Sequence, residues 1–496
     1  MTKHLLRKHN LILIGIIVYL ITAVNSKGVY HADEQYQIIE FAGLKTGTHS
    51  EKDLAWEFKK EIRPSLQPTV CFIIFTVCKV FNITDPYDQA LILRILSAIL
   101  ALISITFFIN VTSRQIQNKS LIPYYKLLSY FLWFIPFISV RFSSETWAGL
   151  CFLLAISLYI SHFKASTKYI FTGILLGVSF LFRFQIAFAV LGFGLWMLII
   201  DKQHIKKVLI IAIFGIITLS FGFLIDCWFY GKIVFAPWNY FYINIIEDAA
   251  SGFGTSPWYF YLKEIIFRST PYIGIPILLS FILFIIKKPK SLVIWCILPF
   301  LIIHSIIPHK EDRFLFPMVF FIPFIIIQII DSFYSLKKFL LIRYSFYLIS
   351  IITFIVNIGG LLIISNKSAG YGHMEITEHL HENYKNDSIN LIYQSYSNPY
   401  NPFMSLPIKH YYTEKIKETR IKNLLELNQN NIDTNKINFL VFYNDCLTAN
   451  GSKENIISNH FILEKQGAPQ WVFYINEYLK IFGTKYLLQL HKYKNE

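Results

Sequence analysis

Residues 292–332 read LVIWCILPFLIIHSIIPHKEDRFLFPMVFFIPFIIIQIIDS, and this stretch decides the fold. Two apolar runs, 292–307 and 315–332, flank five consecutive ionisable residues at 309–313. An α-helix needs about 20 mainly apolar residues to cross the hydrocarbon core of a bilayer, and each run approaches that length. The pattern therefore predicts two membrane spans joined by a short charged loop.

Similar apolar runs recur along most of the chain. Of its 496 residues, 54% are hydrophobic and only 16% are charged, whereas a soluble globular chain carries roughly 25% charged residues. The predicted fold class is therefore an α-helical polytopic membrane protein with about 11–13 transmembrane helices. We place twelve predicted spans near residues 11–24, 68–82, 89–110, 123–140, 146–162, 168–182, 186–200, 208–226, 271–287, 292–307, 315–332 and 343–364.

The net charge of +15 is concentrated in short loops. Loops 201–207, 287–291 and 333–343 are basic, which is the positive-inside pattern of membrane proteins, so we interpret the charge as orienting the spans and expect no nucleic-acid partner. These loops are predicted to be cytoplasmic. The opposite, outer side then holds residues 227–270, 308–314 and the chain after 365. Independently, the basic N-terminus, with Lys3, Arg7 and Lys8, places loop 25–67 on the same outer side.

This topology requires an odd number of crossings between loops 25–67 and 201–207, yet six spans are predicted there. One of the six is therefore expected to be re-entrant, interfacial or falsely split. The segments around Arg141 and Arg183 are the candidates, because a charged residue interrupts the apolar pattern at each.

Two domains are predicted. Residues 1–365 form the transmembrane domain, with 25–67 as its first outer loop, and residues 366–496 form a small extracytoplasmic α/β domain. The second region is rich in Asn, Lys, Glu and Tyr. Strands are expected at 389–393 and 437–443, and helices around 373–385 and 414–430.

The first outer loop carries adjacent acids, in the run His31-Ala32-Asp33-Glu34, followed by Gln37. One interpretation is a general base, since a sugar hydroxyl must lose its proton as it attacks an anomeric carbon. The other is a solvated helix N-terminus, where acidic side chains favour the positive end of the helix dipole. Both interpretations stay open on the residues alone.

The loop at 309–313 carries His309, Lys310, Glu311, Asp312 and Arg313. Arg can hold a phosphate by a two-pronged hydrogen bond and Lys as a point charge, while the two acids could orient these bases. The alternative is a charged loop tip that holds two spans apart.

Further polar residues interrupt or end other apolar runs. Arg141, Glu145 and Arg183 either reach towards lipid headgroups or line a polar cavity. In loop 227–270, Asn244 and Trp258 lie among aromatics that favour an interfacial belt over a sugar-stacking surface. We find no phosphate-binding glycine loop, no zinc motif and no DxD metal motif, so no metal or cofactor is predicted.

These motifs resemble those of the membrane-embedded GT-C glycosyltransferases, specifically the Alg9-like mannosyltransferases of family 22. Its first-loop pattern H-x-D-E-x-x-Q, W-E-F and I-R-[SP] is similar to the residues from His31 to Gln37, Trp56 to Phe58 and Ile62 to Pro64. Its later H-K-E-x-R-F pattern is similar to His309 to Phe314. The stretch from Pro237 to Trp258 is similar to the family's loop pattern T-P-x-x-F, then N, then G-x-H-P-W. Two positions depart from the family: Ala32 stands where the family often has Pro, and Ser256 stands where this loop often has His.

The resemblance implies an inverting transfer of a sugar, mannose in most of the family, from a polyprenyl- or dolichyl-phosphate donor to a glycan or glycolipid acceptor. Asp33 and Glu34 would be catalytic, and the donor phosphate would contact His309, Lys310 and Arg313. The supporting residues would be His31, Gln37, Glu57, Arg63, Arg141, Glu145, Arg183, Asn244, Trp258 and Glu311. The site would face the outer side of a bacterial inner membrane or the lumen of the endoplasmic reticulum.

Two other classes of function compete with this one. A multi-pass transporter or flippase of lipid-linked or small polar substrates would use ionisable residues inside the membrane, and Arg183 and Asp226 favour it. A non-catalytic scaffold of a glycan-assembly complex is the weaker alternative.

Overall fold

The computed structural model describes most of the chain. The described residues are 8–335, 339–370, 372–394, 396–403, 406–412, 415–422, 424–443, 460–479 and 487–494. Part of the predicted basic loop 333–343, including Lys337 and Lys338, lies outside them. The chain divides into two compact units. Unit 1 comprises residues 1–24, 57–70 and 93–366, and unit 2 comprises residues 25–56, 71–92 and 367–496.

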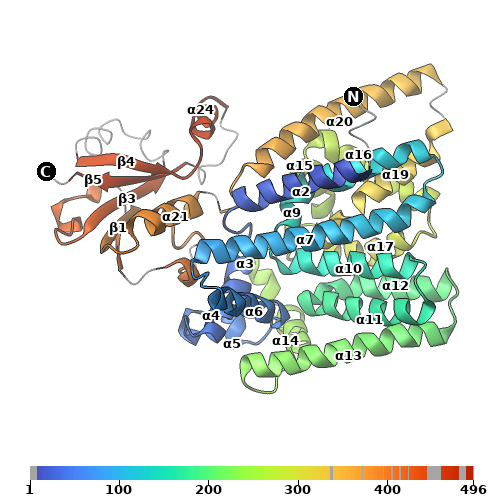
Figure 1. Ribbon diagram of the computed structural model, residues 1–496, viewed down its shortest axis with the longest axis horizontal. Helices are drawn as coiled ribbons and strands as arrows, with labels where there is room; N and C mark the ends of the chain where they lie inside the picture. The colour runs from blue at the N-terminus through green and yellow to red at the C-terminus, as the bar shows by residue number, and fades with distance from the viewer. Residues whose placement is uncertain are drawn as a thin grey trace. The chain divides into compact units, whose positions relative to one another are not determined.

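Unit 1 is built from apolar helices (Figure 1). Such sequences form helices in lipid because the hydrocarbon offers no partner to backbone N–H and C=O groups, and a helix pairs them internally. The helices that lie wholly or partly in this unit are α2 (Lys8–Asn25), α5 (Trp56–Lys59), α6 (Leu66–Val80), α7 (Pro86–Thr112), α8 (Ile122–Phe131), α9 (Phe134–Ser139), α10 (Ser144–Ile160), α11 (Ala165–Phe182), α12 (Ala187–Ile199), α13 (Ile205–Tyr230), α14 (Ala236–Phe241), α15 (Phe260–Arg268), α16 (Pro271–Lys287), α17 (Leu292–Ile306), α18 (Phe316–Val319), α19 (Ile322–Ser332) and α20 (Leu340–Ser365).

Ten of the twelve predicted spans correspond to single apolar helices. Within the described residues, α7, α13 and α20 are the helices long and apolar enough for a complete crossing, and α18 and α19 add a pair bent by 61°. Seven shorter apolar helices accompany them. The predicted helical, membrane-embedded fold class is confirmed.

The predicted span at 123–140 is broken into α8 and α9 at Leu132 and Trp133. The side chain of Asn357 in α20 covers the break: its Oδ1 accepts from the Trp133 backbone N–H at 2.9 Å, and its Nδ2 donates to the Phe131 carbonyl at 2.7 Å. Because α8 has only 10 residues and α9 only 6, neither alone has the length of a crossing. The interrupted segment ends directly before Arg141.

The predicted span at 315–332 is also broken, between α18 and α19. Pro317 and Pro323 lie in the first turns of these helices. Proline lacks the N–H that would continue the preceding helix, and its ring clashes with the carbonyl four residues earlier, so Pro323 separates the two segments.

Close helix packing in unit 1 depends on small residues. In α12, a Cβ added to Gly192 would lie 1.9 Å from the carbonyl oxygen of Trp295 in α17. In α10, a Cβ on Gly149 would lie 2.5 Å from the Cα of Pro317 in α18. In each case the obstacle is backbone, which no side-chain rotation can remove.

Unit 2 joins the first outer segment to a small α/β domain. That domain contains α21 (His373–Tyr384), α24 (Gln470–Leu479) and a sheet of order β2-β1-β3-β5-β4. β1 (Ile389–Gln394) runs parallel to β2 (Ile416–Ile421) and β3 (Ile437–Tyr443). β5 (Leu488–Tyr493) is antiparallel to both β3 and β4 (Phe461–Gln466). The predicted strands at 389–393 and 437–443 and the helix at 373–385 are found.

The helix predicted around 414–430 is wrong. Residues 416–421 form strand β2, and the short 3₁₀ turns Leu424–Glu426 and Gln429–Asn431 follow it. Only Ile416 and Ile421 of the strand are buried, so its polar middle resembles a helix in sequence. Pairing with β1 overrides that local preference.

The α12–α17 contact generates a test with an internal control. Gly192→Ala should lower the free energy of unfolding by about 1–3 kcal/mol, because the new methyl group forces the two backbones apart. Gly194→Ala, two residues along the same helix, meets nothing within 4 Å and should be neutral or slightly stabilising. Thermal unfolding of the purified full chain in detergent measures both. Equal effects would contradict the packing argument.

Glu375 in α21 generates a pH-dependence test. Burial raises the pKa of this carboxyl to about 7 from its ordinary 4.5. Between pH 4.5 and 7 the unfolded chain ionises while the folded protein retains the proton, so stability falls as the pH rises and stays low above pH 7. Glu375→Gln removes this loss. At pH 8 the variant should be more stable than the wild type by about 3 kcal/mol at most, and should therefore unfold at a higher temperature. At pH 4.5 the variant and the wild type should unfold at similar temperatures. A difference independent of pH would contradict this.

Candidate functional site

The acidic motif of the first segment forms a short helical start in unit 2. His31 has an extended backbone, and its Nδ1 accepts from the backbone N–H of Asp33 at 3.3 Å, which begins helix α3 (Ala32–Glu34). The same nitrogen lies 3.5 Å from Asp33 Oδ1. The Asp33 side chain is 15% exposed, whereas Glu34 and Gln37 are buried. His31 therefore orients an acid that solvent or a substrate can still reach.

A π-helical turn, Gln35–Ile39, follows α3 and leads into α4 (Glu40–Thr46). Isolated π turns cost stability and occur often at functional sites. Here the turn carries Gln37 and ends directly before Glu40, which is 1% exposed.

Glu40 holds a buried hydrogen-bond network that the sequence analysis did not assign to the site. Its Oε1 accepts from Gln35 Nε2 at 2.7 Å and from the His410 backbone N–H at 3.4 Å, and its Oε2 pairs with His49 Nε2. The His410 ring stacks on Phe75 at 4.9 Å, and burial lowers its pKa to about 4. The network anchors the acidic motif to the C-terminal part of unit 2. The sequence shows an acid at position 40 but gives no sign that Gln35, His49 and His410 are its partners.

Unit 1 contains a second cluster, centred on Glu145 in the first turn of α10. Glu145 Oε1 lies 3.0 Å from Arg183 Nη1 and 2.7 Å from Arg313 Nη1. Arg183 Nη1 also donates to Ser144 Oγ at 3.2 Å. The three charged side chains are 1–6% exposed, so two guanidinium groups share one buried carboxylate oxygen.

Glu311 extends this cluster to the loop between α17 and α18. Glu311 Oε2 pairs with Arg313 Nε, and Glu311 Oε1 lies 2.9 Å from His309 Nε2. The hydrogen bond to Glu311 raises the pKa of His309, which therefore stays protonated to higher pH. His309 Nδ1 also contacts the Gly254 carbonyl at 3.0 Å. Arg183, Arg313, Glu145, Glu311 and His309 thus form one connected group.

Lys310 is held differently. Its ammonium group donates to the carbonyls of Ile307 at 2.6 Å, Ser256 at 2.7 Å and Pro308 at 3.4 Å. The Ser256 N–H donates in return to the Pro308 carbonyl at 2.9 Å. Lys310 therefore joins two loops of unit 1, and desolvation lowers its pKa.

The other predicted residues of unit 1 lie in separate environments. Glu57 pairs with Arg63 at 3.5 Å, and the Arg63 guanidinium lies over the Tyr240 ring. Arg141 is 1% exposed with its guanidinium over Phe137.

Asn244 and Trp258, both from loop 227–270, are not joined to the cluster by any contact described for them. The Asn244 side chain donates to the Tyr240 carbonyl one turn earlier. Trp258 is 69% exposed and contacts Tyr259.

The two residues that favoured a transporter both have structural partners. Arg183 belongs to the Glu145 cluster. Asp226 Oδ1 accepts from the Ser65 backbone N–H at 2.8 Å and from its hydroxyl at 2.5 Å. Among the described residues, no group of three or more His, Cys, Asp or Glu is arranged to hold a metal ion.

Comparison with solved structures identifies the fold as that of a membrane-embedded GT-C glycosyltransferase. ArnT from Cupriavidus metallidurans, crystallised with undecaprenyl phosphate, superposes with a TM-score of 0.54 at 9% identity over 97% of both chains. The family model for Alg9-like mannosyltransferases matches residues 11–405. The chain therefore belongs to the Alg9-like mannosyltransferase family.

Curated relatives agree with this assignment. GPI alpha-1,2-mannosyltransferase 3 of Xenopus laevis is 25% identical over 304 residues, which are 58% of this chain and 53% of that protein. GPI mannosyltransferase 3 of Debaryomyces hansenii is 26% identical over 321 residues, 61% of this chain and 56% of that protein. The matches thus span about half the length of these relatives. They give the transporter alternative no support.

The buried cluster predicts a large asymmetry between two ion pairs of unit 1. Glu145→Gln leaves two buried guanidinium groups without their shared carboxylate, and should cost about 3–5 kcal/mol of unfolding free energy. Glu264→Gln removes one of two carboxylate partners of Arg268, whose side chain is 68% exposed and also pairs with Asp312, and should cost less than about 1 kcal/mol. Thermal unfolding in detergent compares the two. Similar losses would show that the Glu145 cluster is not effectively buried.

Proposed function

We propose that this protein transfers a sugar, most simply mannose, from a polyprenyl- or dolichyl-phosphate donor to a glycan or glycolipid acceptor with inversion at the anomeric carbon. The observation that carries the proposal is the cluster in which Arg183 and Arg313 converge on Glu145. At this point two buried guanidinium groups face one shared carboxylate oxygen among apolar helices, which is a local excess of positive charge. That excess suits the phosphate of a lipid-linked donor.

In the proposed reaction, the acceptor hydroxyl oxygen forms a bond to C1 of the sugar. The bond from C1 to the phosphate oxygen breaks, and its electron pair leaves with the lipid phosphate. The hydroxyl proton passes to the Asp33 carboxylate. The leaving group is already an anion, so no general acid is required, and cationic side chains stabilise the charge that it gains.

Residue roles follow from this chemistry. Asp33 is the general base, oriented by His31, and Glu34 orients the acceptor or shares the proton. Arg313 and His309 bind the donor phosphate, with Glu145, Arg183 and Glu311 setting their positions. Lys310 can contribute to phosphate binding only by exchanging one of its three carbonyl partners. We therefore assign it a smaller part in phosphate binding than Arg313 and His309.

Other predicted residues receive supporting roles. Gln37 follows the acidic motif within the π turn. The Glu57–Arg63 pair and the buried Arg141 stabilise the polar segments at the ends of their helices. Asn244 and Trp258 belong to the aromatic loop, where they would contact the sugar or the lipid chain.

The basic loops support an orientation with the acidic motif and the His309–Arg313 loop on the outer face of a bacterial inner membrane or in the lumen of the endoplasmic reticulum. In this assignment, residues 1–365 are the transmembrane catalytic domain, and residues 366–496 are an extracytoplasmic domain. The undecaprenyl phosphate bound by ArnT supports the class of donor.

Asp33→Asn tests the proposed base. The amide cannot accept the proton, so kcat should fall by about 100- to 10,000-fold, with folding and membrane insertion unchanged. The measurement is incorporation of radiolabelled mannose from dolichyl-phosphate-mannose into membrane glycolipids. Asp88→Asn is the control, because this exposed acid in the first turn of α7 has no assigned role. Wild-type transfer by the Asp33 variant would remove Asp33 as the base.

A further inference from the structure

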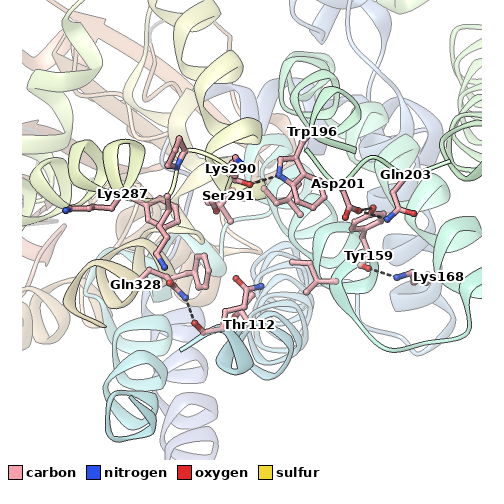
Figure 2. A pocket seen from close by; sticks show the side chains of 18 residues that line it. Thr112, Tyr159, Lys168, Trp196, Asp201, Gln203, Lys287, Lys290, Ser291 and Gln328 are labelled. Atoms are coloured by element: carbon pink, nitrogen blue, oxygen red, sulfur yellow. Dashed lines mark hydrogen bonds between the residues drawn. The ribbon is translucent and has the colours of Figure 1, made fainter. Parts of the chain in front are cut away.

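A cavity of about 680 Å³ lies in unit 1 among the ends of α10, α11, α12, α16 and α17. Figure 2 shows Tyr159, Trp196 and Asp201 on one side of it and Lys287, Ser291 and Gln328 on the other. Its volume lies within the range of small-molecule sites, roughly 300–1,000 Å³. The proposed function uses none of the residues that line it.

The cavity lies at the opposite helix ends from the Glu145 cluster. In α10, Glu145 is in the first turn and Tyr159 in the last, a separation of about 21 Å at 1.5 Å per residue. In α11 the order is reversed: Lys168 lies near the start, and Arg183 directly follows the end. The cavity is therefore separate from the candidate donor site, and it borders loops 201–207 and 287–291, which the charge pattern predicts to be cytoplasmic.

The lining is cationic. It contains Lys168, Lys287, Lys288 and Lys290 against a single acid, Asp201. Asp201 Oδ2 already accepts from the Tyr159 hydroxyl and from Gln203 Nε2 at 2.8 Å. A ligand would therefore meet an excess of positive charge, which selects an anion.

Indole groups hold the lysine-bearing loop in place. Trp196 Nε1 donates to the Lys290 carbonyl at 2.8 Å, and Trp295 Nε1 donates to the Pro289 carbonyl at 3.0 Å. The loop thus needs no rearrangement to present Lys288 and Lys290, and a preformed site avoids the entropy of ordering on binding.

Part of the lining is apolar. Hydrocarbon surface in the same cavity comes from Ile160, Phe284, Leu292, Val293 and Phe324. A small hydrated anion gains nothing from such surface, whereas an amphiphile places its charged head at the lysines and its apolar part against these side chains.

From this combination we infer that the cavity binds the phosphate headgroup of an anionic phospholipid, at the membrane face opposite the candidate donor site. The lysines neutralise the phosphate, and the apolar side chains contact the glycerol and the first methylenes of the acyl chains. The inference does not depend on the glycosyltransferase assignment, because it uses only the far ends of the helices.

Native mass spectrometry of the detergent-purified full chain, titrated with phosphatidylglycerol or phosphatidylcholine, tests the inference. The wild type should bind phosphatidylglycerol at least tenfold more tightly than phosphatidylcholine. The double variant Lys288→Gln/Lys290→Gln should weaken phosphatidylglycerol binding on the order of tenfold and leave phosphatidylcholine binding unchanged. Lys288→Arg/Lys290→Arg retains the charge and should retain binding.

Two further variants separate the cavity from general surface charge. Lys202→Gln/Lys206→Gln removes the same charge from the neighbouring loop but from no residue of the lining, and should bind like the wild type. Ser291→Phe retains every lysine and fills part of the cavity, and should bind phosphatidylglycerol more weakly. Elution volume and thermal midpoint verify that each variant is folded.

Three outcomes would overturn the inference. One is equal loss of binding in the cavity variant and the neighbouring-loop variant. Another is unchanged phosphatidylglycerol affinity in both Lys288→Gln/Lys290→Gln and Ser291→Phe. The third is displacement of phosphatidylglycerol by 10 mM inorganic phosphate (about the concentration of a common buffer), which would assign the cavity to a soluble phosphate ligand.

Discussion

The hydrocarbon of a bilayer offers no hydrogen-bond partner, and the rest of this structure depends on that constraint. Most of unit 1 meets it with uninterrupted helices. Where a helix stops inside an apolar stretch, something else must pair the backbone groups that are released. Asn357 does so for the break at Leu132 and Trp133. Proline, which has no N–H to pair, marks the break at 320–321.

The helix ends that result are where the polar chemistry collects. Ser143 accepts from the Thr146 N–H at the start of α10, and the same turn presents Glu145 to two arginines. Because a lone buried charge is costly, the arginines and Glu145 stabilise one another, and the group persists only as a unit. An incoming phosphate would enter a site whose cations are already ordered.

Much of the fold was predictable from the sequence, because span length and apolarity are local properties. The runs at 208–226 and 343–364 each form one long helix. The acidic motif and the His309–Arg313 loop also stood out, since charges beside apolar runs are unusual. By contrast, the partners were not predictable. Glu145 and Arg313 are 168 residues apart, and Glu40 meets the backbone of His410 across 370 residues. No spacing rule encodes such contacts, and strand β2 formed against its own local preference for the same reason.

The pairing of Asn357 with residues 131 and 133 also has a consequence for the timing of membrane insertion during synthesis. The two partners are separated by 224–226 residues, and a ribosome adds about 5–20 residues per second. For roughly 10 to 45 seconds of synthesis, the segment from α8 to α9 exists without the side chain that closes its gap. During this interval the segment must remain in a place where water or the insertion machinery can form hydrogen bonds to the Trp133 N–H and the Phe131 carbonyl. The order in which the helices leave the ribosome is thus not the order in which they can settle into lipid.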